Sequence, residues 1–327
     1  MIHAPVIFLI FNRPEQTART FAAIRAARPM RLLVVADGPR QGRKGEEELC
    51  RRTRSVVDGV DWPCEVMRNF SDTNMGCGRR VSSGLDWVFA QLEEAIILED
   101  DCLPDQVFFR YCGELLDRYR TDERIMMISG NNFQNGAIRT PDSYYFSQLP
   151  HCWGWATWRR AWRHYDFAMR DWPQIRDSKR IKAIAKNSTL ERRWQDCFDG
   201  VMAGKIDTWD YQWMYCLWTQ KGLAVAPDVN MVANIGFGGA ATHTVAIDER
   251  YLVPSHAMKF PLRHPTAVQP CEAADEFEKA YLYRLSRFPA LERVIVWLRS
   301  MIGWIRPHLE RIGVWKHLRA LALRLRT

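Results

Sequence analysis

The sequence predicts an α/β protein whose central, mainly parallel β-sheet is flanked by helices. Three observations predict this fold class. Short apolar runs alternate with helical patterns over the first 130 residues, turn residues follow the apolar runs, and 47% of the 327 residues are hydrophobic. This length and composition exclude a disordered chain, a collagen-like chain and a small disulfide-linked scaffold.

The first half of the chain contains four expected strands joined by helices. The apolar runs lie at residues 6–11, 31–36, 65–70 and 95–98. Helical patterns lie at residues 15–27, 46–57, 79–91 and 108–119. The turn signal Asp37-Gly38-Pro39 ends the second strand. Strands connected in this way form βαβ units, and the handedness of their crossovers places ligands beyond the carboxyl ends of the strands.

The second half is less regular. A strand is expected at 125–129, and from about residue 140 the pattern becomes irregular and rich in Trp. Helices are expected again at 189–203 and 209–220, followed by a strand at 223–226 and a Gly-rich loop at 234–244. The pattern indicates one continuous two-part domain to about residue 265, then a connector and a helical tail.

The net charge of +8 is confined to the end of the chain. Residues 279–327 carry eleven Lys or Arg and two acids, which leaves a charge of −1 for the rest. This distribution argues against a basic nucleic-acid groove, so we expect no nucleic-acid partner, although alternating Trp and Arg at 158–163 leaves a single-strand binder as an outside alternative. Ile295, Leu298 and Ile302 recur at helical spacing within the basic tail. An amphipathic helix of this kind suits an anionic membrane surface, and a helix docked on the body is the alternative.

Cysteine usage and hydropathy bear on location. The nine Cys are scattered singly, with no CxxC pair, as a reducing compartment permits. The first apolar run has no basic leader and no cleavage site, so it is interpreted as a buried strand. No stretch reaches the roughly 18–20 apolar residues of a membrane span. We therefore expect a cytoplasmic protein that is peripheral on the cytoplasmic face of the membrane.

Three adjacent acids, Glu99, Asp100 and Asp101, follow the fourth strand. Adjacent carboxylates repel one another unless a positive charge lies between them, and hard divalent cations prefer oxygen ligands. The pattern suggests a cation with a bound phosphate, whereas a solvated acidic turn before a helix is the alternative.

Polar residues also follow the first two strands, where they are expected at the same sheet edge. Asn12 and Arg13 follow the first strand and Asp37 follows the second. Arg13 can pair with a phosphate, and Asp37 can accept hydrogen bonds from a base or ribose. Each alone suits a plain turn, but their recurrence at successive strand ends favours a ligand site.

The order of these segments resembles a known family. The segments are FNRPEQT, VVADGP, NMGCGRRVSSGLDWVF, IILEDDCLPDQVFFRY and WGWATWRRAW. Together they resemble GT-A glycosyltransferases, bacterial family-2-type enzymes and the animal N-acetylglucosaminyltransferase I group, over residues 4–245. The resemblance implies a metal-dependent, inverting transfer of a sugar from a nucleoside-diphosphate sugar, most simply a UDP-sugar, to a glycan, lipid-linked or other hydroxyl acceptor. It implies a nucleotide-binding half (1–130), an acceptor-binding and catalytic half (131–265), and the connector and tail (266–327).

The resemblance also assigns roles to residues. It implies that Asn12, Arg13, Glu99 and either Arg79 or Arg80 contact the nucleotide. It also implies that Asp37 contacts the uracil and that Asp100 contacts the ribose or the metal. Asp101 would bind Mn²⁺ or Mg²⁺ directly; the family motif has acids at its first and third positions, which Glu99 and Asp101 fill here.

The segment Trp209-Asp210-Tyr211 is similar to the family segment that bears the catalytic carboxylate, displaced by one residue. Asp210 would then be the general base, with Asp207 and Asp228 as the next candidates, and a helix N-cap is the alternative role for Asp210.

Two further segments are candidates for ligand contact. In the Gly-rich loop, backbone N–H groups such as that of Gly238 can cradle phosphate oxygens, and the resemblance suggests His243 as a further metal ligand; a plain flexible loop with a surface His is the alternative. The Trp-rich segment 153–158, including Trp155, can stack on a pyranose, and a packed core turn is the alternative.

Two other functions compete with glycosyl transfer. A sugar-nucleotide pyrophosphorylase shares the fold, but it normally begins with a Gly-rich phosphate loop that residues 11–14 lack. A membrane-associated carbohydrate-binding protein without catalysis would keep the Trp-rich segment and need no metal.

Overall fold

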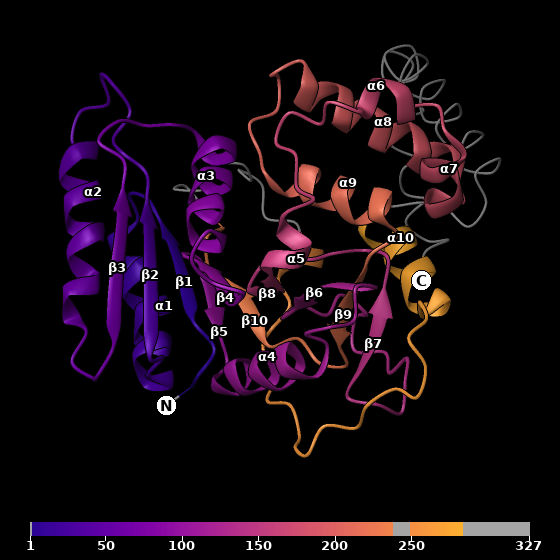
Figure 1. Ribbon diagram of the computed structural model, residues 1–327, viewed down its shortest axis with the longest axis horizontal. Helices are drawn as coiled ribbons and strands as arrows, with labels where there is room; N and C mark the ends of the chain where they lie inside the picture. The colour runs from indigo at the N-terminus through magenta and orange to yellow at the C-terminus, as the bar shows by residue number, and fades with distance from the viewer. Residues whose placement is uncertain (1, 238–248, 284–327) are drawn as a thin grey trace, which may run out of the picture. The chain divides into compact units, whose positions relative to one another are not determined.

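The computed structural model describes residues 2–237 and 249–283, and its central element is a mixed β-sheet. Its strands are β1 (Val6–Ile10), β2 (Arg31–Ala36), β3 (Glu65–Phe70), β4 (Glu94–Glu99), β6 (Ile125–Ser129), β7 (Tyr144–Ser147), β8 (Trp155–Trp158) and β9 (Leu223–Pro227). In this part of the chain the sheet has eight strands, in the order β3-β2-β1-β4-β8-β6-β9-β7 (Figure 1). A separate two-stranded sheet pairs β5 (Cys102–Pro104) with β10 (Val232–Asn234).

The strand directions confirm the mainly parallel sheet. β3, β2, β1 and β4 are parallel neighbours, and β6 and β9 are also parallel to each other. β8 pairs antiparallel with both β4 and β6, and β7 pairs antiparallel with β9. These two antiparallel strands come from the irregular, Trp-rich region, in which the hydropathy pattern predicted no strand. The observed arrangement agrees with the mainly parallel sheet, flanked by helices, that the sequence predicts.

The helices connect and cover the strands. They are α1 (Pro14–Ala27), α2 (Glu46–Ser55), α3 (Cys77–Phe89), α4 (Gln106–Arg118), α5 (Arg159–Trp162), α6 (Trp172–Ile175), α7 (Lys179–Ala185), α8 (Ser188–Met202), α9 (Asp210–Gln220) and α10 (Glu272–Leu282). Their starts follow local chemistry: Pro14 opens α1, the Asp105 carboxylate accepts from the Val107 N–H, and the Asn187 side chain caps α8. The expected helices therefore form close to where the sequence predicts them.

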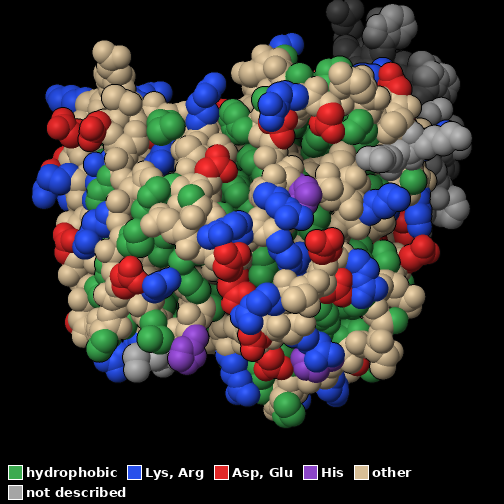
Figure 2. Space-filling view, viewed as in Figure 1, with side chains coloured by type: hydrophobic (Ala, Val, Ile, Leu, Met, Phe, Trp, Pro, Cys, Tyr) green, Lys and Arg blue, Asp and Glu red, His purple; other side chains and the backbone are tan. Residues whose placement is uncertain are grey.

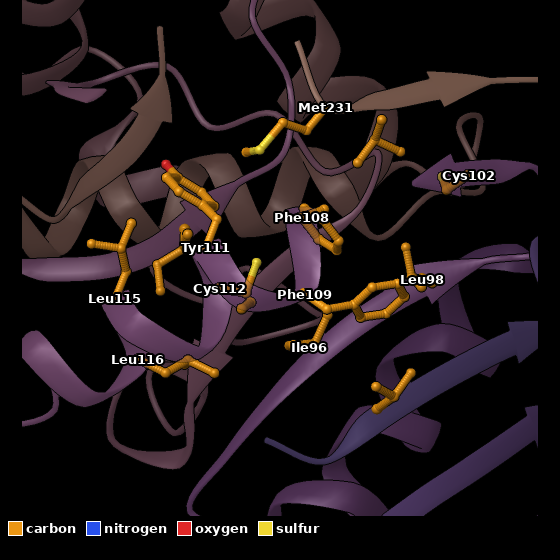
Figure 3. Close-up of a cluster of buried hydrophobic side chains, with 14 of the residues drawn as sticks. Ile96, Leu98, Cys102, Phe108, Phe109, Tyr111, Cys112, Leu115, Leu116 and Met231 are labelled. Carbon is orange, nitrogen blue, oxygen red and sulfur yellow. The ribbon is translucent and has the colours of Figure 1, made fainter. Parts of the chain in front are cut away.

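The two faces of the sheet bury separate hydrophobic clusters, because successive strand residues point to opposite faces. One face packs Phe8, Ile96 and Leu98 against α1 and α4, and Figure 3 shows α4 side chains such as Phe108 over this face. The other face packs Ile7 and its neighbours against α3, α5 and α9. Burial on both faces explains why the parallel strands appear in the sequence as continuous apolar runs.

The first compact unit extends to Leu282, beyond the body end near residue 265 that the sequence pattern suggested. Helix α10 belongs to this unit because it buries polar side chains against it. The Ser147 hydroxyl donates to Asp275 at 2.6 Å, and Lys279 Nζ donates to the Ile184 carbonyl at 2.7 Å. The expected amphipathic tail helix falls within residues 284–327, outside the described residues.

The surface of the described residues is mixed in charge. Lys and Arg side chains alternate with Asp and Glu over the face seen in Figure 2. This mixture agrees with the near-neutral charge of the body in the sequence. In the described part of the chain, every helix is too short or too polar to cross a bilayer.

Candidate active site

The carboxyl ends of β1, β2 and β4 lie side by side because these strands are parallel neighbours in the sheet. Arg13 follows β1, Asp37 follows β2, and Asp100 and Asp101 follow β4. The fold thus brings the polar residues of three strand ends to one edge, where ligands of α/β proteins bind.

Arg13 and the acidic residues form one ion-paired group. Arg13 Nη1 lies 2.6 Å from Asp101 Oδ2 and 3.4 Å from Asp100 Oδ1. The Phe11 N–H donates to Asp100 Oδ2 at 3.2 Å. Burial opposes the charge of Arg13, but the carboxylates of Asp100 and Asp101 outweigh it and raise the Arg13 pKa. The guanidinium therefore stays charged and holds both carboxylates.

Arg13 does not fully offset the burial and mutual repulsion of the acidic residues. Burial raises the pKa of Asp100 to about 7, with the Asp101 carboxylate adding to the effect and Arg13 opposing it. Burial also raises the pKa of Glu99 well above its usual range, and the carboxylates of Asp101, Asp100 and Asp210 add to it. A further cation at this edge would relieve the repulsion.

The loop that follows β10 closes on Asp101. The Ile235 N–H donates to the Asp101 carbonyl at 2.8 Å, and β10 pairs with β5 directly after the acidic residues. An added Cβ at Gly236 would lie only 2.8 Å from Asp101 Cβ and closer still to Oδ2. Only glycine allows the backbone to approach the carboxylate so closely.

The carboxylates at this edge fit one kind of divalent-cation site, in which the protein supplies few of the ligands. Among the described residues, no three His, Cys, Asp or Glu side chains form a metal-binding group. Mg²⁺ sites commonly use one or two carboxylates and complete their ligands with substrate phosphates and water. Asp101, which follows the buried carboxyl groups of Glu99 and Asp100, can supply a carboxylate to that kind of site. His243, the other expected metal ligand, and Gly238, expected to contact phosphate, lie outside the described residues.

Asn12 and Asp37 are held by partners within the protein. The Asn12 amide donates to Glu46 Oε1 at 2.9 Å. The Asp37 carboxylate accepts from the backbone N–H groups of Gly38 and Met75 and from Asn74 Nδ2, each at 2.9 Å. Burial raises the pKa of Asp37 although these backbone donors oppose the shift. Asp37 thus anchors the end of β2 to the loop before α3, a role that the sequence did not reveal.

The two arginines of α3 differ in environment. Arg80 is buried: its Nε donates to the Ala36 carbonyl at 3.1 Å and its Nη2 to Asn69 Oδ1 at 2.8 Å. Arg79 is exposed, and its guanidinium lies 5.7 Å from the centroid of the Phe167 ring. Of the pair, Arg79 is the one accessible to a ligand.

Asp210 lies at the start of α9, close to the acidic residues. Its carboxylate contributes to the raised pKa of Glu99, and together with burial it raises the pKa values of the Cys77 and Cys152 thiols. It is half-buried and hydrogen-bonds the Thr208 hydroxyl. Asp210 therefore acts electrostatically on Glu99, the first of the three adjacent acids.

Asp207, the neighbouring candidate, has a different task. Its carboxylate accepts from the N–H groups of Cys77 and Gly78, both at 2.9 Å. These are the first residues of α3, where an anion also interacts favourably with the helix dipole. Asp207 thus caps a helix that lies far from it in the sequence.

The Trp-rich segment is mainly core. Trp155 is fully buried and stacks on Trp209 with ring centroids 5.4 Å apart. It has no exposed face for a pyranose, which corrects its assignment as a ligand contact, and it is a core residue of strand β8 and not part of a turn. Trp153 is only half-buried, and its ring meets Phe237 and Tyr251 edge-on at 5.7 Å. Tyr251 had no recognisable signal in the sequence.

The comparisons with known proteins found weak structural similarity and no sequence match. The sequence matches no family model and no curated protein. Mouse xyloside xylosyltransferase 1 is similar in structure, at 9% identity over 68% of this chain and 84% of that chain, with a TM-score of 0.35. The glycosyltransferase GlyE of Streptococcus pneumoniae TIGR4 has 8% identity over 68% of this chain and 45% of its own, with a TM-score of 0.30. HddC from Yersinia pseudotuberculosis has 8% identity over 49% and 78%, with a TM-score of 0.30. Identities and TM-scores this low give no information on what this chain binds or catalyses.

Proposed function

We propose that the chain is a metal-dependent, inverting glycosyltransferase of the GT-A type. It would move a sugar from a nucleoside-diphosphate sugar, most simply a UDP-sugar, to a hydroxyl group of a glycan, lipid-linked or other acceptor. The observation that carries the proposal is the ion-paired group of Arg13, Asp100 and Asp101 at the carboxyl edge of the sheet, with Glu99 beside it and Asp210 acting on Glu99. No single structural role accounts for Glu99, Asp100 and Asp101 around one guanidinium, with Asp210 acting on Glu99 from α9.

The proposal divides the binding work between two sets of residues. Asp101 would hold Mn²⁺ or Mg²⁺, and Arg13 would pair with the diphosphate. When bound, the metal would stabilise the negative charge of the departing diphosphate. Arg79 is exposed near the start of α3 and suits a contact with the nucleotide.

Asp210 would act as the general base. An acceptor hydroxyl has a pKa far above 7 and must lose its proton as the glycosidic bond forms. The half-buried Asp210 carboxylate, oriented by the Thr208 hydroxyl, is the available proton acceptor. A single displacement needs no second nucleophile, so the anomeric configuration would invert.

The donor can be identified first, by the change in melting temperature with UDP-, GDP-, CMP- and dTDP-sugars, each with and without Mn²⁺. A bound ligand raises the melting temperature by mass action, so stabilisation that requires both a sugar nucleotide and Mn²⁺ supports the proposal. An unchanged melting temperature with every pair would contradict it.

Asp210→Asn then tests the mechanism with the identified donor and an acceptor panel, scored by nucleotide release. We expect donor and Mn²⁺ affinity to stay near wild type, while transfer slows by about 10²–10⁴-fold. Asp196→Asn, an exposed carboxylate on α8, is the matched control and should transfer at the wild-type rate. Near-normal transfer by Asp210→Asn would place the base elsewhere, and retained anomeric configuration in the product would refute the single displacement.

We also propose that the basic tail attaches the protein to an anionic membrane surface. The charge of +9 over residues 279–327 and the helical spacing of its apolar residues support this proposal. Truncation before Phe288 should abolish co-sedimentation with phosphatidylserine-containing vesicles and leave the melting temperature of the body unchanged. Equal sedimentation of both forms would reject the proposal.

A further inference from the structure

Arg13 holds the carboxylate that the proposed function assigns to the metal. Its Nη1 lies 2.6 Å from Asp101 Oδ2, and the two side chains are only 13% and 16% exposed. A second, longer contact of 3.4 Å joins the same nitrogen to Asp100 Oδ1. The pair is therefore poorly screened by solvent, unlike an ion pair on the surface.

A divalent cation that approaches Asp101 alone meets an unfavourable arrangement. One carboxylate oxygen already accepts from the guanidinium, and the other lies 3.6 Å from the Cys102 thiol. The cation must either displace Arg13, which would leave a largely buried guanidinium with a weaker partner, or remain beside a like charge. Both choices weaken metal binding.

A nucleoside diphosphate changes this balance. Its phosphate oxygens are ligands for the cation and also hydrogen-bond acceptors for a guanidinium. With a phosphate present, Arg13 can leave Asp101 and pair with the phosphate. The cation then replaces Arg13 on the Asp101 carboxylate. The exchange conserves charge pairing, because each positive group keeps a negative partner.

We infer that Arg13 is a counter-cation that keeps Asp101 from binding a divalent metal until a nucleoside diphosphate is present. The inference rests on the proposed function and adds a regulation to it: the metal and the nucleotide bind cooperatively, and Arg13 carries the coupling. Because coupling between binding sites is reciprocal, the same residue makes nucleotide affinity depend on the metal.

The test is the Mn²⁺ affinity of the full chain, measured by electron paramagnetic resonance of free Mn²⁺ with and without UDP. Without UDP, Arg13→Ala should bind Mn²⁺ about tenfold more tightly than wild type, because a poorly screened positive charge is removed. Arg13→Lys keeps the charge and should stay close to wild type. Arg25→Ala removes an equal charge from an exposed ion pair with Asp61 on the surface of α1 and should also match wild type.

Adding UDP should reduce the difference in Mn²⁺ affinity between wild type and Arg13→Ala. Wild type should gain Mn²⁺ affinity when UDP is added, and Arg13→Ala should gain much less. If Arg13→Ala fails to fold, as judged by its melting curve, Arg13→Gln serves in its place, because it removes the charge and retains an amide donor toward Asp101. Equal or weaker Mn²⁺ affinity in the neutral variant without UDP would overturn the inference.

The double variant Arg13→Ala/Asp101→Asn locates the effect. It should lose the gain in Mn²⁺ affinity, and a gain that persists would overturn the inference by placing the metal elsewhere. The role of Arg13 and the metal dependence of the protein are tested separately. If wild type binds Mn²⁺ with UDP but Arg13→Ala shows no gain, only the role of Arg13 is wrong. If wild type binds no Mn²⁺ even with UDP, the metal dependence of the proposed function fails and the inference fails with it.

Discussion

Gly236→Ala tests how closely the loop after β10 closes on the acidic residues. The new Cβ would lie 2.8 Å from both Asp101 Cβ and Asp101 Cγ, and closer still to Oδ2. The carboxylate end can rotate away, but Asp101 Cβ cannot move without its backbone. The backbone of residue 236 lies outside the left-handed region, so alanine meets no conformational penalty there. The contact with Asp101 is the whole perturbation.

The expected loss of stability follows from the hydrogen bonds that the added methyl group disturbs. Separating the two backbones strains the 2.8 Å hydrogen bond from the Ile235 N–H to the Asp101 carbonyl and the 2.8 Å bond from the Gly236 N–H to Asn234 Oδ1. Each such bond contributes about 1 kcal/mol, and overpacking typically costs about 1–3 kcal/mol. We expect the free energy of unfolding to fall by about 1–3 kcal/mol and Mn²⁺-dependent UDP affinity to fall by about tenfold or more.

Urea unfolding and calorimetric titration of UDP with Mn²⁺ measure the two effects. Gly113→Ala is the matched control, since an added Cβ there meets nothing within 4 Å and the residue lies inside α4. That variant should gain about 0.5–1 kcal/mol of stability and bind UDP normally. Wild-type stability and UDP affinity in Gly236→Ala would refute the close approach of residue 236 to Asp101.

Three further predictions concern the residues that hold the site in place. Asp37→Ala should lower the free energy of unfolding of the ligand-free protein by about 3 kcal/mol, because it leaves the Gly38 and Met75 N–H groups without their acceptor and removes one of the two acceptors of Asn74 Nδ2; unchanged urea unfolding would show that Asp37 has no structural role. Asp207→Ala should cost about 1–2 kcal/mol through loss of the α3 cap, and equal thermal stability would contradict the cap. Burial raises the pKa of Asp275 to about 6, so the folded protein retains a proton that the unfolded chain releases, and stability should fall by about 3 kcal/mol from about pH 4 to pH 6 on account of this group. Asp275→Asn should remove that part of the fall in stability, as measured by urea unfolding at a series of pH values. An unchanged pH profile would show that this carboxyl titrates normally.

The sequence by itself determined the fold class and the edge of the sheet at which the acidic residues lie. Strands such as β1 and β4 are buried on both faces, so they appear as uninterrupted apolar runs, and turn residues mark where each one ends. Parallel pairing then brings the residues after those strands together, which is why Arg13 and Asp101 could be expected at one edge. Local pattern is sufficient for such predictions, because hydrophobic periodicity and turn chemistry act over a few neighbouring residues.

Only the tertiary structure decided which partner each polar or aromatic side chain takes. Trp155 lies in the core because β8 pairs between β4 and β6. Asp207 caps α3, although it follows Cys77, the first residue of that helix, by 130 residues in the sequence. Helix α10 buries Asp275 against Ser147 from the far end of the compact unit. A carboxylate has the same local signal whether it binds a metal, caps a helix or pairs with an arginine. Its role depends on which distant segment packs beside it, and that is set by the free energy of the whole fold.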